Sequence, residues 1–241
     1  SGEISYNYDG FGQLVSKAAG NKAETFKYDL LGNVVESNGE NGKTNYSYDD
    51  LGRLKTEKTD SGIVKKYTYD YNNNRTSFKV YTNYSDLQQD LSYVYDNLNR
   101  ITSIKEGNST VASYTYNDNG NLLSENNVAV KNDFVYNRAG MVLSKTVKNS
   151  AGTELKNYTY TYNLDGNVAS YNGLNYTYDD NNRLSAVAEG TSNKGYTFDN
   201  RGNRLSLNET GSDVSDTVNY VYDTNNRILE RTFGNEKDSF A

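Results

Sequence analysis

Four residue types are absent from this sequence of 241 residues: cysteine, histidine, proline and tryptophan. Without cysteine or histidine the chain has no disulfide, no thiolate chemistry, no zinc site and no histidine-based catalytic triad. The lack of proline suits a chain made almost wholly of hydrogen-bonded strands, where a missing backbone N–H is damaging. The lack of tryptophan removes the aromatic side chain that is preferred in sugar-binding platforms.

Clustered positive charge and long apolar runs are also missing. The formal net charge is −6 and there is no basic run, so we expect no nucleic-acid partner, because phosphate contacts need clustered lysine and arginine. No apolar stretch approaches the length of a membrane span, and no signal peptide is present, so membrane insertion is not expected. The sequence begins and ends within its own pattern, which predicts a fragment of a longer protein.

What the sequence does contain is a nine-residue phrase, YSYDDLGRL at residues 46–54, of which some version occurs eleven times. Tyr46 and Tyr48 stand two apart, so both rings project from the same face of an extended strand. Asp49 ends the strand, because its carboxylate can accept backbone N–H bonds within a tight turn. Gly52 suits a residue at positive φ, and Leu54 begins the return strand. The phrase therefore predicts half of a β-hairpin and its turn.

The copies agree position by position. The first aromatic is Tyr6, Phe26, Tyr46, Tyr67, Tyr93, Tyr114, Phe134, Tyr160, Tyr176, Tyr196 or Tyr220, and the second, two residues later, is Tyr except at Phe198. An Asp or Asn follows at Asp9, Asp29, Asp49, Asp70, Asp96, Asn117, Asn137, Asn163, Asp179, Asp199 and Asp223. Three residues later stands Gly12, Gly32, Gly52, Asn73, Asn99, Gly120, Gly140, Gly166, Asn182, Gly202 or Asn226. Because Gly and Asn enter left-handed backbone space at least cost, this last position reflects a backbone requirement.

Spacing of the copies predicts the fold. Successive second aromatics lie 16 to 26 residues apart, and a second turn between them, such as Asn172-Gly173, divides each unit into two strands. Eleven units give roughly twenty-two short antiparallel strands, which exceeds what an open twisted sheet holds without curling. We expect an all-β fold of tandem hairpins in one array over residues 1–241, with repeats at about 6–229 and the start of a further unit at 231–241.

The phrase Y-x-Y-D-x-x-G-[NR]-L, seen at residues 26–34 and 46–54, resembles the YD repeat of Rhs proteins. Related arrays occur in Rhs and wall-associated polymorphic toxins, in the shell subunits of Tc toxins and in teneurins. The resemblance implies that the hairpins wind as a spiral sheet into part of a hollow shell, which in the toxins encloses a C-terminal effector. The chain departs from the toxins in lacking the proline- and Asp-containing signature at which their arrays cleave themselves. We also expect no cargo domain directly after these repeats, because residues 231–241 resemble the opening of a further unit.

The sequence contains two sets of residues, those that define the repeat and tyrosines outside it that are candidates for ligand contact. The repeat-defining structural residues are represented by Tyr46, Tyr48, Asp49, Gly52 and Leu54 in one copy and by Tyr176, Tyr178, Asp179, Asn182 and Leu184 in another. The tyrosines outside the repeat positions are the candidates for ligand contact: Tyr71, Tyr81, Tyr84, Tyr158 and Tyr171. Adjacent carboxylates such as Asp49 and Asp50 point to opposite sides of a strand end and make a poor acid/base couple. We expect no catalytic residue, no metal site and no cofactor, since the Asp-rich turns lack the Glu that completes a calcium loop.

The sequence is compatible with two functions. The first is a non-catalytic structural repeat domain, part of an extracellular shell or scaffold whose parent encloses a toxin. The alternative is a cell-surface adhesion module that binds carbohydrate or a protein receptor. Either reading places the protein outside the cell, secreted or on the cell surface, with the rest of its parent chain as a partner. The terminal strands of such an array are unpaired, which also predicts self-association through them.

Overall fold

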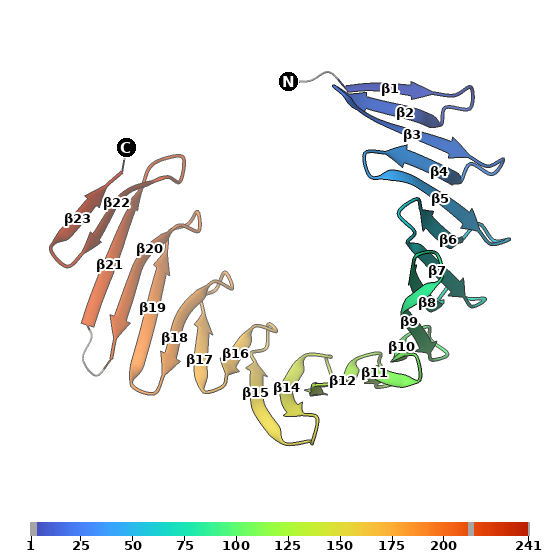
Figure 1. Cartoon of the computed structure of the whole chain (residues 1–241). Coiled ribbons are helices and arrows are strands. Elements are labelled where there is room, and N and C mark those ends of the chain that lie inside the picture. The colour runs from blue at the N-terminus through green and yellow to red at the C-terminus, as the bar shows by residue number, and fades with distance from the viewer. Residues whose placement is uncertain (1–3, 212–214, 241) are drawn as a thin grey trace. The chain divides into compact units, whose positions relative to one another are not determined.

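The structure is a computed structural model that describes residues 4–211 and 215–240. In these residues it contains 23 β-strands and no helix, which confirms the predicted all-β fold and comes close to the predicted twenty-two strands. Successive strands pair antiparallel and are joined by tight turns, so the chain is a run of β-hairpins (Figure 1).

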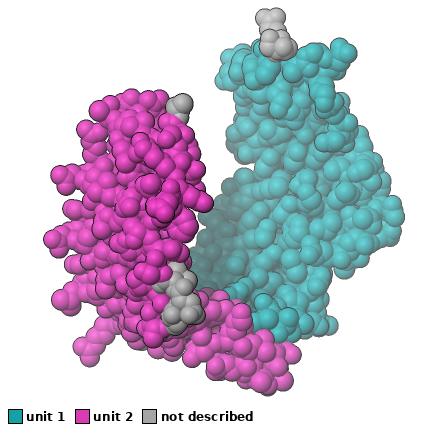
Figure 2. Space-filling view, turned by 90° about the vertical axis from the view of Figure 1, so that its left-hand side faces the viewer, with its two compact units in different colours: residues 1–116, 124–130 teal, residues 117–123, 131–241 magenta. Residues whose placement is uncertain are grey.

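The chain divides into two compact units, coloured separately in Figure 2. Unit 1 holds residues 1–116 and 124–130, and unit 2 holds residues 117–123 and 131–241. The strands that lie wholly in unit 1 are β1 (Ile4–Tyr8), β2 (Leu14–Ala19), β3 (Lys22–Tyr28), β4 (Val34–Gly39), β5 (Gly42–Tyr48), β6 (Leu54–Thr59), β7 (Val64–Tyr69), β8 (Arg75–Thr82), β9 (Asp86–Tyr95), β10 (Ile101–Glu106) and β11 (Ser109–Tyr116).

The strands that lie wholly in unit 2 are β14 (Val142–Asn149), β15 (Glu154–Tyr162), β16 (Val168–Tyr171), β17 (Leu174–Tyr178), β18 (Leu184–Glu189), β19 (Ser192–Phe198), β20 (Arg204–Thr210), β21 (Ser215–Tyr222), β22 (Ile228–Phe233) and β23 (Glu236–Ser239). Two strands, β12 (Leu122–Asn127) and β13 (Val130–Tyr136), contain the residues at which the assignment to units changes. The two longest strands, β9 with 10 residues and β15 with 9, lie in the two stretches where successive second aromatics are 26 residues apart, Tyr69 to Tyr95 and Tyr136 to Tyr162.

The turn of the repeat has one geometry, seen at Asp49. The Asp49 carboxylate Oδ1 accepts the backbone N–H groups of Leu51 at 3.0 Å and Arg53 at 2.9 Å. The Gly52 N–H donates to the Asp49 carbonyl at 2.9 Å, and Gly52 has φ 75°. Every one of the eleven Gly and Asn residues at this position has positive φ, from 58° at Asn182 to 89° at Gly202, as the sequence predicts.

The hairpins that are closed by a repeat turn also carry a β-bulge beside that turn. In the hairpin of β5 and β6, Ser47 pairs with Thr56 but Tyr48 pairs with Leu54, so the return strand contains one extra residue. The same shift precedes Tyr28, Tyr69 and Tyr178 in their hairpins. A bulge of this kind increases the local twist and re-aims the side chains next to it.

Each unit is a single-layered sheet with little enclosed core. Only Gly62, Val64 (7% exposed) and Ser206 (8% exposed) are buried among the described residues. The repeat aromatics are half-buried, apart from the exposed Tyr6 and Tyr8, and the residue between each pair of aromatics is exposed on the opposite face. The rings therefore cover one another along one face of the sheet, hereafter the tyrosine face, instead of being enclosed between two layers.

The turn geometry yields a stability prediction. We expect Gly52→Val to lower the free energy of unfolding by more than about 1 kcal/mol, because a β-branched residue is strained at positive φ. A Cβ at Gly52 meets nothing within 4 Å, so the loss reports backbone strain and not a steric clash. Gly52→Asn is the matched control and should be mild, since Asn73 and Asn99 hold φ of 67° and 62° at the same position. Equal losses in thermal melts of the two variants would contradict the assignment.

Candidate functional site

The strongest recurring contact lies on the tyrosine face, between one hairpin and the next. The hydroxyl of the second aromatic donates to the backbone carbonyl of the first residue of the preceding return strand. In the copy at residues 46–54 the Tyr48 hydroxyl donates to Val34 O at 2.8 Å. The same bond joins Tyr28 to Leu14, Tyr69 to Leu54, Tyr95 to Arg75, Tyr116 to Ile101, Tyr136 to Leu122, Tyr162 to Val142, Tyr178 to Val168 and Tyr222 to Arg204, at 2.7 to 3.0 Å. At Phe198 the hydroxyl is missing, and the Arg183 guanidinium lies over the ring, 4.7 Å from its centroid.

These bonds lie where backbone pairing between hairpins has ended. Strands β4 and β5 pair from Gly39 and Gly42 to Glu36 and Asn45. Val34 lies two residues beyond that last pair, on the side of the turns. The Tyr48 hydroxyl reaches its carbonyl, so that a side chain replaces the backbone donor that the diverging strands no longer supply.

The turns of neighbouring repeats are also tied to each other. Arg53 donates through Nη1 to Asp70 O at 2.7 Å and to Asn73 Oδ1 at 2.9 Å, and its guanidinium lies 4.8 Å from the Tyr69 ring centroid. Arg183 makes the equivalent bond to Asp199 O at 2.9 Å. In repeats with Asn at this position, the side-chain amide bridges the turns instead, as from Asn74 to Asn99 at 2.7 Å. Arg53 and Arg183 thus each connect their own turn to the next repeat turn.

Hydrogen bonds hold the turn carboxylates in their ionised form. For Asp49, Asp96, Asp179 and Asp223 the backbone N–H of the arginine four residues on is the largest cause of a lowered pKa. For Asp29, Asp70 and Asp199 the side-chain amide of the asparagine at that position is the largest cause of the lowered pKa. Hydrogen bonding to the carboxylate favours its charged form and lowers its pKa. Burial acts in the opposite direction, because desolvation raises the pKa of a carboxyl group.

Three of the five tyrosines proposed for ligand contact lie in unit 1, in different settings. Tyr71 is at the tip of a turn and is fully exposed (102%). Tyr81 lies beneath the Lys66 ammonium, 4.8 Å from its ring centroid. Tyr84 folds onto the neighbouring loop, where its hydroxyl donates to Asp60 O at 3.0 Å. The structure does not bring these three rings together at one site.

Tyr84 adopts an unusual backbone conformation for its size. Asn83 and Tyr84 have φ of 47° and 65°, and the Ser85 N–H donates to Thr82 O at 3.1 Å, which closes a two-residue hairpin turn between β8 and β9. Glycine is the usual residue at the second position of such a turn. The Tyr84 N–H donates to Gly62 O at 2.8 Å, so contacts to the adjacent loop offset the strain.

The other two candidates, Tyr158 and Tyr171, lie together in unit 2. Their rings are parallel within 5°, with centroids 6.2 Å apart. The repeat aromatic Tyr160 lies 5.1 Å from Tyr171 at a tilt of 31°, and burial is the largest cause of the raised pKa of Tyr160. The pairing of β15 with β16 places Tyr171 opposite Tyr160 in register. This cluster of three rings is the most extensive aromatic surface that the candidates form.

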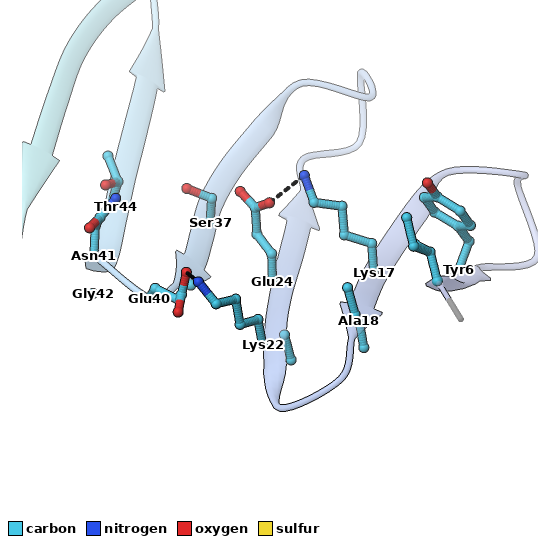
Figure 3. A pocket seen from close by; sticks show the side chains of 14 residues that line it. Tyr6, Lys17, Ala18, Lys22, Glu24, Ser37, Glu40, Asn41, Gly42 and Thr44 are labelled. Atoms are coloured by element: carbon cyan, nitrogen blue, oxygen red, sulfur yellow. Dashed lines mark hydrogen bonds and ion pairs between the residues drawn. The ribbon is translucent and has the colours of Figure 1, made fainter. Parts of the chain in front are cut away.

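A groove of about 610 Å³ lies over strands β1 to β5 on the tyrosine face (Figure 3). Its lysines are paired: Lys17 with Glu24 at 2.6 Å and Lys22 with Glu40 at 2.9 Å, while the half-exposed ring of Tyr6 (51%) lies beside the first pair. The Glu24 hydrogen bond is the largest cause of the raised pKa of Lys17. Paired charges beside an aromatic ring form a polar surface without a strong field of either sign.

Sequence reasoning did not find this groove. Lys17, Glu24 and Glu40 stand outside the repeated positions, so the period that reveals the turns carries no signal for them. A local signal does exist, since lysine and glutamate stand opposite each other across the Gly20-Asn21 turn, but it identifies an ion pair and not a groove.

The described part of the chain shows no set of three Asp or Glu side chains arranged to hold a metal ion. Among the same residues, no helix has the length and hydropathy of a membrane span. The Asp that opens a repeat turn accepts backbone N–H groups of its own turn, as Asp49 and Asp179 do.

Comparison with known proteins places this geometry in context. Residues 34–160 match the profile of the Teneurin YD-shell family. The chain is also similar to the crystal structure of TcdB2-TccC3-TEV, with 15% identity over 95% of this chain and 15% of that one and a TM-score of 0.59. For the crystal structure of TcdB2-TccC3 without its hypervariable C-terminal region, the identity is 14%, the coverage 97% and 15%, and the TM-score 0.59.

A third similar structure is the Photorhabdus luminescens Tc holotoxin pore with a mutation in TccC3, at 14% identity, 95% and 15% coverage and a TM-score of 0.56. At these identities the likeness shows the fold alone. The chain spans about 15% of the length of these solved chains. No curated protein sequence matches it.

The lowered pKa values of the turn carboxylates predict a loss of stability in acid. A carboxylate with a pKa below its unfolded value stabilises the fold above the unfolded pKa of about 3.9, and that contribution is lost as pH falls through the folded pKa. We expect the melting temperature to drop between about pH 5 and pH 3. The triple variant Asp29→Asn, Asp49→Asn, Asp70→Asn should show a smaller drop, because Asn keeps the Oδ1 acceptor but does not titrate.

Asn is tolerated at this position, as Asn137 shows by accepting the N–H groups of Ala139 and Met141. Asp50→Asn, at an exposed turn tip, is the matched control. If the control flattened the pH dependence as much as the triple variant did, the turn carboxylates would not be its source.

The hydroxyl bond on the tyrosine face yields a second prediction with changes of opposite sign. We expect Tyr48→Phe to lower the free energy of unfolding by about 0.5–1.5 kcal/mol, the net value of one hydrogen bond. Phe198→Tyr should raise it by a similar amount, because the ring position beneath Arg183 matches that of Tyr69 beneath Arg53, where the hydroxyl is bonded. Denaturant melts of both variants measure the two changes, and a destabilised Phe198→Tyr would show that the bond is not transferable between repeats.

Proposed function

Because this chain belongs to the Teneurin YD-shell family, we propose that it is a non-catalytic structural domain that forms part of the wall of an extracellular β-shell. Its parent protein is secreted or at the cell surface, and its partners are the other parts of the same parent chain. In a parent of the toxin type, the shell encloses a C-terminal effector. The similarity to Tc toxin structures supports this assignment at the level of the fold.

The observation that carries the proposal is the chain of hydroxyl-to-carbonyl bonds between successive hairpins. Five such bonds lie in unit 1 and four in unit 2, so both units are built by the same rule. Each repeat is held by its neighbours and not by a second layer, which is how quasi-one-dimensional arrays extend. A sheet that is one layer thick and consists of linked hairpins has the construction of a wall.

A second candidate function is adhesion by carbohydrate binding, and two observations favour it. The groove beside Tyr6 presents neutralised charge pairs and an accessible ring. The parallel rings of Tyr158 and Tyr171 offer a stacking surface in unit 2. Sites for small polar ligands combine such rings with a few placed polar groups.

A glycan array distinguishes the two functions. If the chain is a wall, we expect no reproducible glycan binding by the wild-type chain. Binding that is lost at least tenfold in Tyr158→Ala with Tyr171→Ala, but kept in Tyr71→Ala, would favour adhesion instead. Tyr71 is the matched control because it is an exposed aromatic that lies outside the cluster.

Electron cryomicroscopy of the longer parent protein tests the shell itself. We expect residues 4–211 and 215–240 to form part of the wall of a closed cavity. One face of the sheet, either the tyrosine face or the opposite face, should point into the cavity and the other should point outward. An intact parent in which these residues enclose no cavity would contradict the proposed function, whatever the glycan array shows.

A further inference from the structure

The tips of the repeat turns differ in chemistry between the two units. A tip consists of the two residues between the Asp or Asn and the Gly or Asn of each turn. In unit 1 the five turns that follow β1, β3, β5, β7 and β9 lie along one edge of the sheet (Figure 1). Their tips carry six exposed apolar side chains: Phe11 (93%), Leu30 (106%), Leu31 (83%), Leu51 (68%), Tyr71 (102%) and Leu98 (66%). Asp50 is the one charged residue among these tips.

The same positions in unit 2 are polar. The tips there are Asp118-Asn119, Arg138-Ala139, Leu164-Asp165, Asp180-Asn181, Asn200-Arg201 and Thr224-Asn225. Leu164 (106%) is their one large apolar side chain. The turn geometry is identical in both units, so it does not require apolar tips. The apolar row of unit 1 is therefore a property of the surface and not of the fold.

A hollow separates the first two tips of the row. It has a volume of about 510 Å³ and is lined by Phe11, Val15, Phe26, Tyr28, Leu30 and Leu31 among others. A hollow of about 540 Å³ occupies the equivalent place in unit 2, between the turns at residues 199–202 and 223–226, but polar tip residues such as Asn200 and Arg201 line it. The tips of unit 1 recur along the edge with the spacing of one hairpin, about 10 Å or two strand separations.

We propose that the turn edge of unit 1 is a dimerisation surface, on which a second copy of this chain packs through its own apolar tips. A row of tips with one period is complementary to itself when two copies lie antiparallel with an offset of half a period. Each tip of one copy then faces the space between two tips of the other copy. Such an arrangement is an isologous twofold interface. Exposed apolar patches larger than a few hundred Å² are uncommon on monomers and mark interaction surfaces.

Area and charge both agree with this occupant. Six exposed apolar side chains at roughly 150–200 Å² each amount to on the order of 1,000 Å², comparable with the about 800 Å² that each partner buries in a standard interface. The tips of unit 1 carry little charge, so two copies meet there without strong repulsion. The tips of unit 2 carry five charged residues and do not form such an uncharged surface.

The test is the oligomeric state of the chain as it stands, measured by sedimentation equilibrium. We expect a concentration-dependent dimer, and an increase of at least 100-fold in its dissociation constant in the triple variant Leu30→Lys, Leu51→Lys, Tyr71→Lys. Leu164→Lys is the matched control, because it has the same residue type, turn position and exposure as Leu30, and it should change the constant less than threefold. Circular dichroism should be unchanged in both variants, since the tips are exposed. The melting temperature should also be unchanged when it is measured below the dissociation constant of the dimer, where dimerisation does not stabilise the wild-type chain.

Crosslinking gives an independent readout, because the chain contains no cysteine. Leu51 is on the middle turn of the row and lies nearest the twofold axis, about half a period or ~5 Å from its symmetry mate, which is within disulfide range. We expect Leu51→Cys to form a disulfide-linked dimer on oxidation, and Leu164→Cys to form far less.

Three outcomes would overturn the proposal. A wild-type chain that stays monomeric at every concentration excludes the dimer. A dimer that survives the triple variant but is lost in Asn7→Pro assigns the contact to the edge strand β1 instead. A monomer that binds phosphatidylcholine vesicles through Leu30 and Leu51 assigns the row to a lipid surface.

Discussion

A hydrogen bond from a tyrosine hydroxyl to the carbonyl of the preceding hairpin, as between Tyr48 and Val34, holds successive hairpins together. In each unit the sheet has one layer, so apolar burial between layers, the main source of stability in most domains, is small. What remains is contact between neighbours within the sheet. A phenol supplies both parts of that contact, because its ring covers the adjacent ring and its hydroxyl satisfies a backbone carbonyl.

The turns complete this arrangement. An Asp or Asn caps the backbone N–H groups of its own turn, and the residue four positions later reaches the next turn, as Arg53 does with Asp70. Hydroxyl pairs such as Thr68 with Thr76 and Thr161 with Ser170 line the opposite face, at 2.9 and 2.7 Å. Each hairpin is thus joined to its neighbours along the tyrosine face and at the turns. Both faces remain accessible, which suits a wall and leaves room for a groove such as the one beside Tyr6.

The two edges of the sheet carry different chemistry. The repeat turns have one backbone geometry, and their tips are free to vary, which allows an apolar row in unit 1 and a charged row in unit 2. The second turns vary in length and conformation, and they provide the irregular features: the Tyr84 loop against Gly62, and the short hairpin that brings Tyr171 to Tyr158. The differences in side-chain chemistry and turn conformation between repeats are therefore concentrated at the edges, while the repeat positions maintain the sheet.

The local structure can be predicted from the residues alone: the strands, their turns and the positive φ at Gly52 and its ten equivalents depend on side chains within one nine-residue phrase. The same phrase predicts that Tyr46 and Tyr48 share a face. The bonding partner of the second aromatic depends on the tertiary fold, since Tyr48 and Val34 lie 14 residues apart and meet through the bulge and the divergence of adjacent hairpins. The tertiary fold also explains three further features: the half-burial of the rings, the contact of Tyr84 with Asp60 and the pairing of Tyr158 with Tyr171. Each depends on which surface a neighbouring hairpin covers, and a period along the chain specifies the neighbour but not the depth to which it buries a side chain.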